Sequence, residues 1–374
     1  MRIAIVGPFP PFRGGIADLN SALAHHLSQA HDISAFNFTT QYPKALFPGK
    51  TQLKEGAAAQ DFPNIRCLSS VNPTTWKKTA SLIAETEPDI VIFRYWMPFF
   101  APAFSGVAKR IKKQTDINII AVCDNIIPHE QRALDQQLST RFFNYIDSFI
   151  VLSKKVEEEL LSILPDANYK YSPHPIYSIF MEAPAQDEAK KQLNISAKNV
   201  LMFFGLIREY KGLDILIKAV GKLKDELDDF ILLIVGECYE DEQKYVELIQ
   251  QCGLVDDVQT HFSFVPDEEV GKFFATTDVV VLPYKTASQS GIVQIAYHYD
   301  TPVIVSNVGG LPEIVDEGKT GFCVEPNPGS FADAIRSFYS IEDKESFRSN
   351  IAEYKKRFSW DAMVKTVEEL SHAG

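Results

Sequence analysis

Short apolar runs that resemble buried β-strands alternate with helical patterns along almost the whole chain. The runs lie at 2–7, 33–39, 89–96, 117–122, 147–153, 200–205, 230–236, 258–264, 278–283 and 302–306. Between them the apolar spacing is helical, as in 213–227, where one face carries Leu213, Leu216, Ile217, Val220 and Leu223. Strict strand–helix alternation is typical of parallel sheets covered by helices. The pattern therefore predicts an α/β fold with doubly wound sheets.

The chain has 374 residues, more than one ordinary hydrophobic core supports, so we expect two domains. The segment 171–185, YSPHPIYSIFMEAPA, contains three prolines, which favour extended backbone and indicate an interdomain hinge. We place the first domain at 1–175 and the second at 176–357. The amphipathic segment at about 358–374 is predicted to be a helix that packs on either domain, with a return to the first as one option. His174, between two of the prolines, is interpreted as structural rather than catalytic.

The composition is that of a soluble globular protein, with 45% hydrophobic and 23% charged residues. No apolar run is long enough to span a bilayer, and the start, MRIAIVGPFPP, predicts a buried strand rather than a signal peptide. Five scattered cysteines without a C-x-x-C pair are typical of a reducing compartment, so we expect a cytoplasmic protein. They are Cys67, Cys123, Cys238, Cys252 and Cys323.

The net charge of −12 argues against nucleic acid as a partner. The charge is uneven: residues 1–175 carry 18 Lys/Arg and 16 Asp/Glu, a net of +2, and the remaining residues carry 19 and 33, a net of −14. The first half also contains the basic amphipathic stretch FSGVAKRIKKQTD, with Lys109, Arg110, Lys112 and Lys113 opposite an apolar face. Such a face is either solvated or in weak peripheral contact with an anionic membrane.

Residues 278–324 contain a strand that ends in a polar turn, Thr286–Gly291, and opens a short helix at Ile292. The first N–H groups of a helix have no partner within it, and the helix dipole adds partial positive charge there. Ser290 and Gly291 are placed to aim these donors at a phosphate. An ordinary helix cap is the alternative interpretation.

Two further loops follow strands in the same way. Arg208 and Lys211 come after the strand that ends at Gly205, at the carboxyl edge where ligands bind in open α/β sheets. Arg and Lys both suit a diphosphate, although two solvated cations are the alternative. Near the start of the chain Gly14 and Gly15 precede a helix, but there is no G-x-G-x-x-G and no acidic residue at the end of the second strand, which counts against an NAD enzyme.

The segments FFGLIREYKGLD, DVVVLPY and GIVQIAYHYDTPVIVSNVGGLPEIVDEGKTGF together resemble the retaining glycosyltransferases of family 4, the glycosyl transferases group 1. The match is mainly within residues 200–325. The resemblance implies the GT-B fold, two Rossmann-like doubly wound domains facing across a cleft. It also implies transfer of a sugar from a nucleotide-sugar donor with retained configuration, and no metal or other cofactor.

The resemblance also implies roles for individual residues. Arg208 and Lys211 would hold the diphosphate and stabilise it as it leaves. The backbone of Ser290, Gly291 and Ile292 would cap it, and Gly14 and Gly15 would approach it from the facing domain.

The chain departs from the family at three positions. The arginine that relatives usually carry directly after the glycine at 205 is Leu206 here, with Arg208 two positions further on as a candidate substitute. Aligned on Gly291, the two glutamates that many relatives use for the sugar and the ribose are Ser288 and Ala296 here. Gln289, Gln294 and Tyr297 are candidate replacements, and the sequence does not choose between them.

The acceptor side is expected in the first domain. Asp124 follows a strand and is predicted either to orient a sugar hydroxyl or accept the acceptor proton, or to form an Asx turn or helix cap. Asn125 and His129 are further candidates for sugar contact. Tyr95 and Trp96 end another strand and, with loop 41–54, form the predicted acceptor surface, core packing being the alternative for the aromatic rings.

The sequence therefore predicts a metal-independent, retaining hexosyl-type glycosyltransferase of surface polysaccharide or glycoconjugate biosynthesis. Its partners would be a nucleotide-sugar donor and a glycan or lipid-linked acceptor, and it would be cytoplasmic, with a location at the inner face of the membrane as a variant. A non-catalytic nucleotide-sugar-binding protein and another GT-B enzyme, such as a sugar-nucleotide epimerase, are the alternatives.

Overall fold

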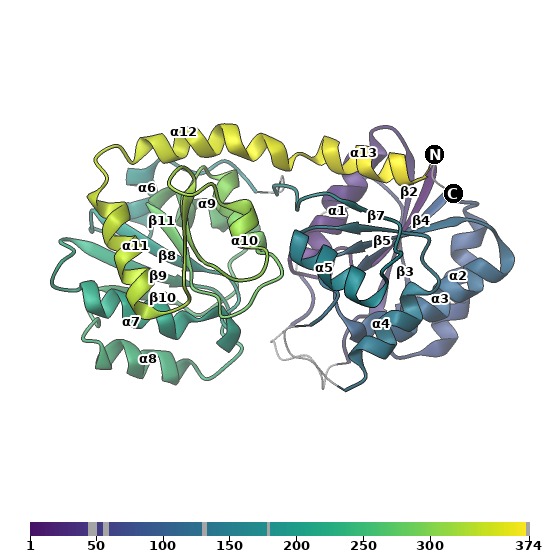
Figure 1. Ribbon diagram of the computed structural model, residues 1–374, viewed down its shortest axis with the longest axis horizontal. Helices are drawn as coiled ribbons and strands as arrows, with labels where there is room; N and C mark the ends of the chain where they lie inside the picture. Colours follow the sequence, from purple (N-terminus) through teal and green to yellow (C-terminus); the bar gives the residue numbers. More distant parts are fainter. Residues whose placement is uncertain (44–50, 55–59, 129–132, 178–179, 372–374) are drawn as a thin grey trace. The chain divides into compact units, whose positions relative to one another are not determined.

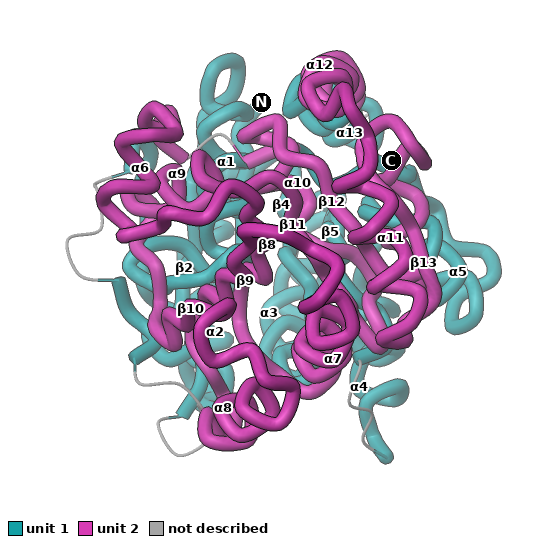
Figure 2. Tube along the Cα trace, turned by 90° about the vertical axis from the view of Figure 1, so that its left-hand side faces the viewer, with its two compact units in different colours: residues 1–175, 358–374 teal, residues 176–357 magenta. Residues whose placement is uncertain are grey.

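The computed structural model describes residues 1–43, 51–54, 60–128, 133–177 and 180–371. Its contacts divide the chain into two compact units (Figures 1 and 2). Unit 1 contains Met1–Pro175 and Phe358–Gly374, and unit 2 contains Ile176–Arg357. Each unit is a parallel sheet covered by helices, and together they have the two Rossmann-like domains of the GT-B fold.

Unit 1 is built on a seven-stranded parallel sheet in the order β3-β2-β1-β4-β5-β6-β7. The strands are β1 Arg2–Val6, β2 Asp32–Thr40, β3 Asn64–Ser69, β4 Ile90–Tyr95, β5 Asn118–Cys123, β6 Ser148–Val151 and β7 Tyr169–Tyr171. The order reverses between β1 and β4, so a switch point lies at their carboxyl ends. The sequence pattern missed β3 and β7, the two edge strands, because neither is a continuous apolar run.

Helices cover both faces of this sheet. On one face α2 Pro73–Glu85, α3 Ala101–Gln114 and α4 Asp135–Phe143 lie side by side (Figure 1). On the other, α1 Gly15–Ser28 packs against α13 Trp360–Ser371, the last helix of the chain. The short η2 Pro98–Phe100 precedes α3, and α5 Lys154–Ile163 connects β6 to β7. The predicted apolar face of α3 is confirmed, since Phe104, Val107, Ala108 and Ile111 are all buried.

Unit 2 has a six-stranded parallel sheet in the order β10-β9-β8-β11-β12-β13. Its strands are β8 Asn199–Phe204, β9 Phe230–Val235, β10 Val258–His261, β11 Val279–Leu282, β12 Val303–Ser306 and β13 Gly321–Val324. The switch point lies between β8 and β11, so the loops after these two strands are neighbours at the carboxyl edge. Only β13, a half-exposed edge strand, was absent from the predicted set.

The helices of unit 2 are α6 Gln186–Gln192, η3 Glu209–Lys211, α7 Leu213–Leu223, α8 Glu242–Gln251, α9 Asp267–Thr276, α10 Gly291–His298, η4 Pro312–Ile314, α11 Pro328–Ser340, α12 Glu345–Tyr354 and η5 Lys355–Phe358. The predicted helix beginning at Leu213 is confirmed, although it ends four residues earlier than expected. No helix among the described residues is long and apolar enough to cross a membrane.

Candidate functional site

The loop that follows β8 is fixed against the end of β11 by glycines that no other residue could replace without strain. Gly212, at the start of α7, has φ 68°, and a Cβ on it would lie 1.9 Å from the carbonyl oxygen of Pro283. The backbone N–H of Lys285 donates to the carbonyl of Tyr210 at 2.7 Å and closes the same contact. The loop that carries Arg208 and Lys211 therefore lies directly beside the turn that leads into α10.

The loop after β9 packs against the other side of the loop that carries Arg208 and Lys211. Gly236 approaches so closely that a Cβ on it would lie 1.9 Å from the carbonyl oxygen of Gly205. Ile207 donates its N–H to the carbonyl of Glu237 at 3.0 Å and accepts from the N–H of Tyr239 at 3.0 Å. Three adjacent loops thus enclose the two predicted phosphate-binding cations.

Both cations rest on aromatic rings. The guanidinium carbon of Arg208 lies 5.0 Å from the ring centre of Tyr239. Lys211 Nζ lies 3.7 Å from the ring centre of Tyr284 and 5.3 Å from that of Tyr210. Ring faces hold a cation without neutralising it, and among the described residues neither side chain forms an ion pair. Sequence reasoning missed Tyr239 and Tyr284 as partners, since they come from loops that are adjacent in space but distant from Arg208 and Lys211 in the sequence.

The ammonium group of Lys211 is in a partly desolvated position. Burial is the main cause that lowers its pKa, the phenol of Tyr210 opposes the shift, and the nearby charge of Arg208 adds to the lowering. An anion bound between Arg208 and Lys211 would relieve both the desolvation and the repulsion. The pair is therefore arranged to gain more from a phosphate than two solvated cations would.

The first turn of α10 lies next to this loop. A Cβ on Gly205 would be 3.1 Å from Cδ1 of Ile292, so that the end of β8 and the start of α10 are in contact. Ser290 precedes the helix in extended conformation, and no side chain caps the helix. Its hydroxyl lies 3.4 Å from that of Tyr284, the ring under Lys211. The structure thus brings Ser290, Gly291 and Ile292 together with the Lys211 loop, and the uncapped turn offers N–H donors to an anion.

The candidate replacements for the missing glutamates differ in the hydrogen bonds that they already form within the protein. Tyr297 is committed to the core, because its hydroxyl donates to the carbonyl of Ile314 at 2.7 Å and lies 2.8 Å from the hydroxyl of Thr320. Gln294 is fully buried, and neither its amide nitrogen nor its amide oxygen has a hydrogen-bond partner in the described part of the chain. Gln289 is half-buried. Of the three, Gln294 retains the most unused hydrogen-bonding capacity.

In unit 1 the predicted glycine loop is open. Gly14 and Gly15 are exposed, Gly14 has φ 111° immediately before α1, and no side chain caps that helix. The loop behind it is held by Asn37, which accepts from the N–H of Phe9 at 3.1 Å and donates to the Phe9 carbonyl at 3.0 Å. The side-chain amide of Asn37, in β2, thus orders the loop that follows β1.

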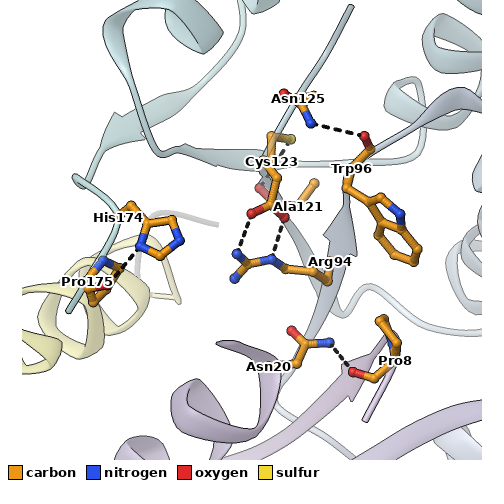
Figure 3. Close-up of polar contacts among 10 residues, drawn as sticks. Pro8, Asn20, Arg94, Trp96, Ala121, Cys123, Asn125, His174 and Pro175 are labelled. Atoms are coloured by element: carbon orange, nitrogen blue, oxygen red, sulfur yellow. Dashed lines mark hydrogen bonds and ion pairs between the residues drawn. The ribbon is translucent and has the colours of Figure 1, made fainter. Parts of the chain in front are cut away.

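Asp124 has a role that neither sequence interpretation included. Its carboxylate accepts two hydrogen bonds of 2.6 Å from Nε and Nη2 of Arg94, and both side chains are 2% exposed (Figure 3). Arg94 is the last but one residue of β4 and Asp124 follows β5, so the pair lies next to the switch point of the unit 1 sheet. A buried bidentate pair is chiefly an internal link.

His174 is buried near this pair. Its Nδ1 donates to the carbonyl of Pro175 at 2.8 Å (Figure 3), which places the ring proton on that nitrogen. Burial is the main cause that lowers the His174 pKa to about 4. The neutral ring therefore belongs to the folded interior at ordinary pH.

The other predicted acceptor residues are mostly packed. Tyr95 is fully buried, with its hydroxyl 2.6 Å from that of Ser139, and Trp96 packs on Phe100 with ring centres 4.2 Å apart. The half-buried Asn125 donates to the Trp96 carbonyl at 3.5 Å. Core packing thus holds for these rings. His129 and residues 44–50 of the predicted acceptor loop lie outside the described residues.

Comparison with known proteins shows that unit 2 matches a known protein family. Residues 185–358 match the family described as Glycosyl transferases group 1. The chain is 31% identical over 165 residues to a D-inositol 3-phosphate glycosyltransferase of Paenarthrobacter aurescens, covering 43% of this chain and 40% of that protein. It is 26% identical over 352 residues to a GDP-mannose-dependent mannosyltransferase of Mycolicibacterium smegmatis that acts on phosphatidylinositol monomannoside, covering 89% and 86%.

A third relative, spore coat protein SA of Bacillus subtilis, is 25% identical over 199 residues, covering 49% of this chain and 51% of that protein. The chain thus spans about half the length of spore coat protein SA and 40% of the length of the Paenarthrobacter aurescens protein. Among solved structures, a glycosyltransferase of Rickettsia africae has a TM-score of 0.75 at 18% identity, covering 100% of this chain and 98% of that one. HepE of Anabaena in complex with UDP has 0.73 at 18%, covering 99% of both chains. These structures support the fold.

Proposed function

Because its second unit belongs to the glycosyl transferases group 1 and the chain has the GT-B fold, we propose that the protein is a retaining glycosyltransferase. It moves a hexosyl group from a nucleotide sugar to a glycan or lipid-linked acceptor. The proposed setting is surface polysaccharide or glycoconjugate biosynthesis in the cytoplasm, at the inner face of the membrane.

One observation carries the proposal: Arg208, Lys211 and the uncapped first turn of α10 converge at the carboxyl edge of the unit 2 sheet. Loss of a nucleoside diphosphate from the anomeric carbon builds negative charge on the β-phosphate. Fixed cations and N–H dipoles stabilise that charge without reorganising during the reaction, which is usually the largest catalytic term. They provide positive charge that a divalent metal would otherwise supply, so no metal is required.

The proton of the acceptor hydroxyl needs a destination. In a front-face mechanism the departing phosphate itself takes that proton, and no dedicated base is required. This route suits a chain with Ser288 and Ala296 at the two glutamate positions. It also suits the Arg94–Asp124 pair, whose carboxylate is already engaged by a guanidinium.

Ribose or sugar recognition is assigned to Gln294, the buried amide without partners among the described residues. A buried amide without partners costs free energy that a bound hydroxyl would recover. Gly14 and Gly15 remain candidates for a separate anion contact in unit 1.

The first experiment determines which nucleotide the protein binds. Purified protein is tested by thermal shift against UDP, GDP, ADP and their sugar conjugates, because a ligand that binds only the folded state raises the melting temperature. UDP is the first candidate, since it is bound in HepE. We expect one nucleotide family to raise the melting temperature, and no rise with any of them would contradict the proposed donor site.

A non-catalytic nucleotide-sugar binder is the second candidate, favoured by the two missing glutamates. The two functions separate in a transfer assay that follows release of nucleoside diphosphate with membrane extract as acceptor source. Acceptor-dependent release that Lys211→Met abolishes supports the enzyme. Tight donor binding without any release over a range of acceptors supports the binder.

A further inference from the structure

Tyr177, the second residue of unit 2, lies against the first residue of α10. A Cβ added to Gly291 would be 2.8 Å from the hydroxyl oxygen of Tyr177 and 3.4 and 3.5 Å from Cε2 and Cζ of its ring. Because the Cα–Cβ bonds of a helix tilt towards its N-terminus, the hydroxyl is displaced towards the uncapped end of α10. The side chain is 5% exposed, so it forms a buried wall beside this turn.

The backbone does not explain why position 291 is a glycine. Gly291 is the first residue of a regular helix and does not have a positive φ, so alanine would suit its conformation better. All three of the nearest atoms that a Cβ would meet there belong to Tyr177. The close packing of Tyr177 is thus the structural reason for a residue without a Cβ at the start of α10.

The chain segment that follows the hinge holds the Tyr177 ring in place. The ring centre of Phe180 lies 5.7 Å from that of Tyr177 and 6.0 Å from that of His298, the last residue of α10. His298 also forms hydrogen bonds with the backbones of Tyr177 and Phe180. The hydroxyl of Tyr299 donates to the carbonyl of Met181 at 3.0 Å. The segment therefore contacts α10 at both its first and its last turn.

Helix α9 supports this segment from outside. Tyr299 stacks on Phe274 of α9 with ring centres 5.1 Å apart. Gly271, also in α9, approaches both partners, since a Cβ on it would lie 3.2 Å from the Tyr299 hydroxyl and 3.3 Å from Cα of Ala183. Close packing on every side leaves little room for adjustment. The Tyr177 ring therefore cannot yield to a bulkier neighbour without moving the segment or the helix.

We propose that Tyr177 is a positioning residue of the diphosphate site. Its ring fixes the first turn of α10, so that the N–H groups of this turn stay aimed at the phosphate held by Lys211. Such donors stabilise an anion only when they are fixed at the right distance and direction. Tyr177 precedes residues 185–358, which match the family model, so the match does not cover it. The inference rests on the proposed diphosphate site.

The test is calorimetric titration of the full chain with inorganic pyrophosphate, which carries the anion without a base or a sugar. We expect the parent chain to bind it and Lys211→Met to bind it more weakly. A parent chain that does not bind pyrophosphate would overturn the diphosphate site and this inference with it. A loss of affinity in Lys211→Met, with parental affinity in all variants of Gly291 and Tyr177, would overturn the positioning role alone.

A pair of compensating substitutions tests the contact between Tyr177 and Gly291. Gly291→Ala should weaken pyrophosphate binding about tenfold, because its Cβ meets the Tyr177 hydroxyl. Tyr177→Phe removes only this hydroxyl and leaves ring atoms at 3.4 and 3.5 Å, which are ordinary contact distances. The double variant should therefore recover most of the lost affinity. A double variant as weak as Gly291→Ala would mean that the Cβ obstructs the ligand itself, and would overturn the proposal.

A second pair separates positioning from stability. Tyr177→Leu removes the ring from Gly291 and should weaken pyrophosphate binding about tenfold. The matched control is Phe338→Leu in α11, where Phe338 is 1% exposed and lies beside Asp278 and Pro302, just before β11 and β12 and thus at the opposite edge of the sheet. Both variants should lower the melting temperature, but only Tyr177→Leu should lose affinity. Equal affinities in the two folded variants would reduce Tyr177 to a stabilising core residue.

Discussion

His174 is a buried neutral base whose effect on stability should depend on pH. Its pKa is about 4 in the folded protein against 6.5 for an ordinary histidine. Between these values the unfolded chain binds a proton that the folded chain does not. The free energy of unfolding of unit 1 should therefore fall as the pH drops from 6.5 towards 4, by about 3 kcal/mol in total.

This pH effect is measured by denaturant unfolding at a series of pH values, followed by tryptophan fluorescence, because Trp76, Trp96 and Trp360 all lie in unit 1. His174→Gln should flatten the dependence between pH 6.5 and 4 relative to the parent chain. Parallel curves for the two proteins would show that His174 is not the responsible group.

The Arg94–Asp124 pair should contribute mainly through what its loss leaves behind. Asp124→Asn leaves a buried guanidinium without its charge partner and should cost about 3–5 kcal/mol. The double variant Arg94→Met, Asp124→Leu removes both charges and should cost far less. Urea unfolding of the single and double variants gives these values, and an Asp124→Asn variant as stable as the parent would contradict them.

The double variant also tests whether Asp124 takes part in transfer. A folded double variant with normal nucleotide affinity and slow transfer would support the sequence-based role of Asp124 at the acceptor. Normal transfer would restrict Asp124 to the internal link with Arg94.

At the residue level the sequence was sufficient to locate the charged residues of the candidate sites, but not the side chains that they contact. Arg208 and Lys211 were found because they follow a strand in a recognisable loop. The rings of Tyr239 and Tyr284 come from the loops after β9 and β11, and their approach depends on strand order. Asp124 was found in the same way, whereas its pairing with Arg94 depends on the neighbouring positions of β4 and β5.

At the level of elements, glycines set the distance between adjacent loops of unit 2. Gly212 and Gly318 have similar backbone angles, φ 68° and 72°, but only Gly212 has neighbours within reach of a Cβ. Gly318→Ala should therefore cost only backbone strain, about 1–2 kcal/mol. Gly212→Ala should cost more and should also weaken nucleotide binding, because its Cβ would push the Lys211 loop away from Pro283.

Thermal unfolding and nucleotide titration of both glycine variants make this comparison. Equal stability losses and equal nucleotide affinities would show that the close approach at Gly212 does not position the loop.

The central strands could be predicted because burial on both faces makes them continuous apolar runs. The edge strands β3, β7 and β13 were not predicted, since their sequences are short or mixed, whereas the edge strand β10 was located from the run at 258–264. The phosphate loop could likewise be located, but its glycine contacts could not, because they join residues that are distant in sequence.

At the level of the whole molecule, the chain returns to its first unit at its end. Trp360, which begins α13, stacks on His26 of α1 with ring centres 5.1 Å apart and is 7% exposed. Glu368 contacts His31 at 2.9 Å, and Leu370 accepts from Asn118 at 2.9 Å. These contacts tie residues 358–371 to α1 and β5.

Trp360→Ala should therefore destabilise unit 1 by about 3–5 kcal/mol while leaving nucleotide binding by unit 2 intact at low temperature. Lys365→Ala, on the exposed side of α13, should change stability by less than about 0.5 kcal/mol. Fluorescence-detected urea unfolding measures both variants. A Trp360→Ala variant with the stability of the parent would mean that α13 is dispensable for unit 1.

The account depends most on the diphosphate site of unit 2, and calorimetric titration tests it most directly. The nucleoside diphosphate identified by thermal shift is titrated into the parent chain, Lys211→Met and Lys222→Met. The first variant keeps a long side chain that can pack on Tyr284 but removes the charge, and the second removes an exposed charge from α7, the helix that follows the Lys211 loop. We predict that Lys211→Met weakens binding by about ten- to a hundredfold and that Lys222→Met binds like the parent. Unchanged affinity in Lys211→Met would contradict the assignment of this loop as the phosphate site.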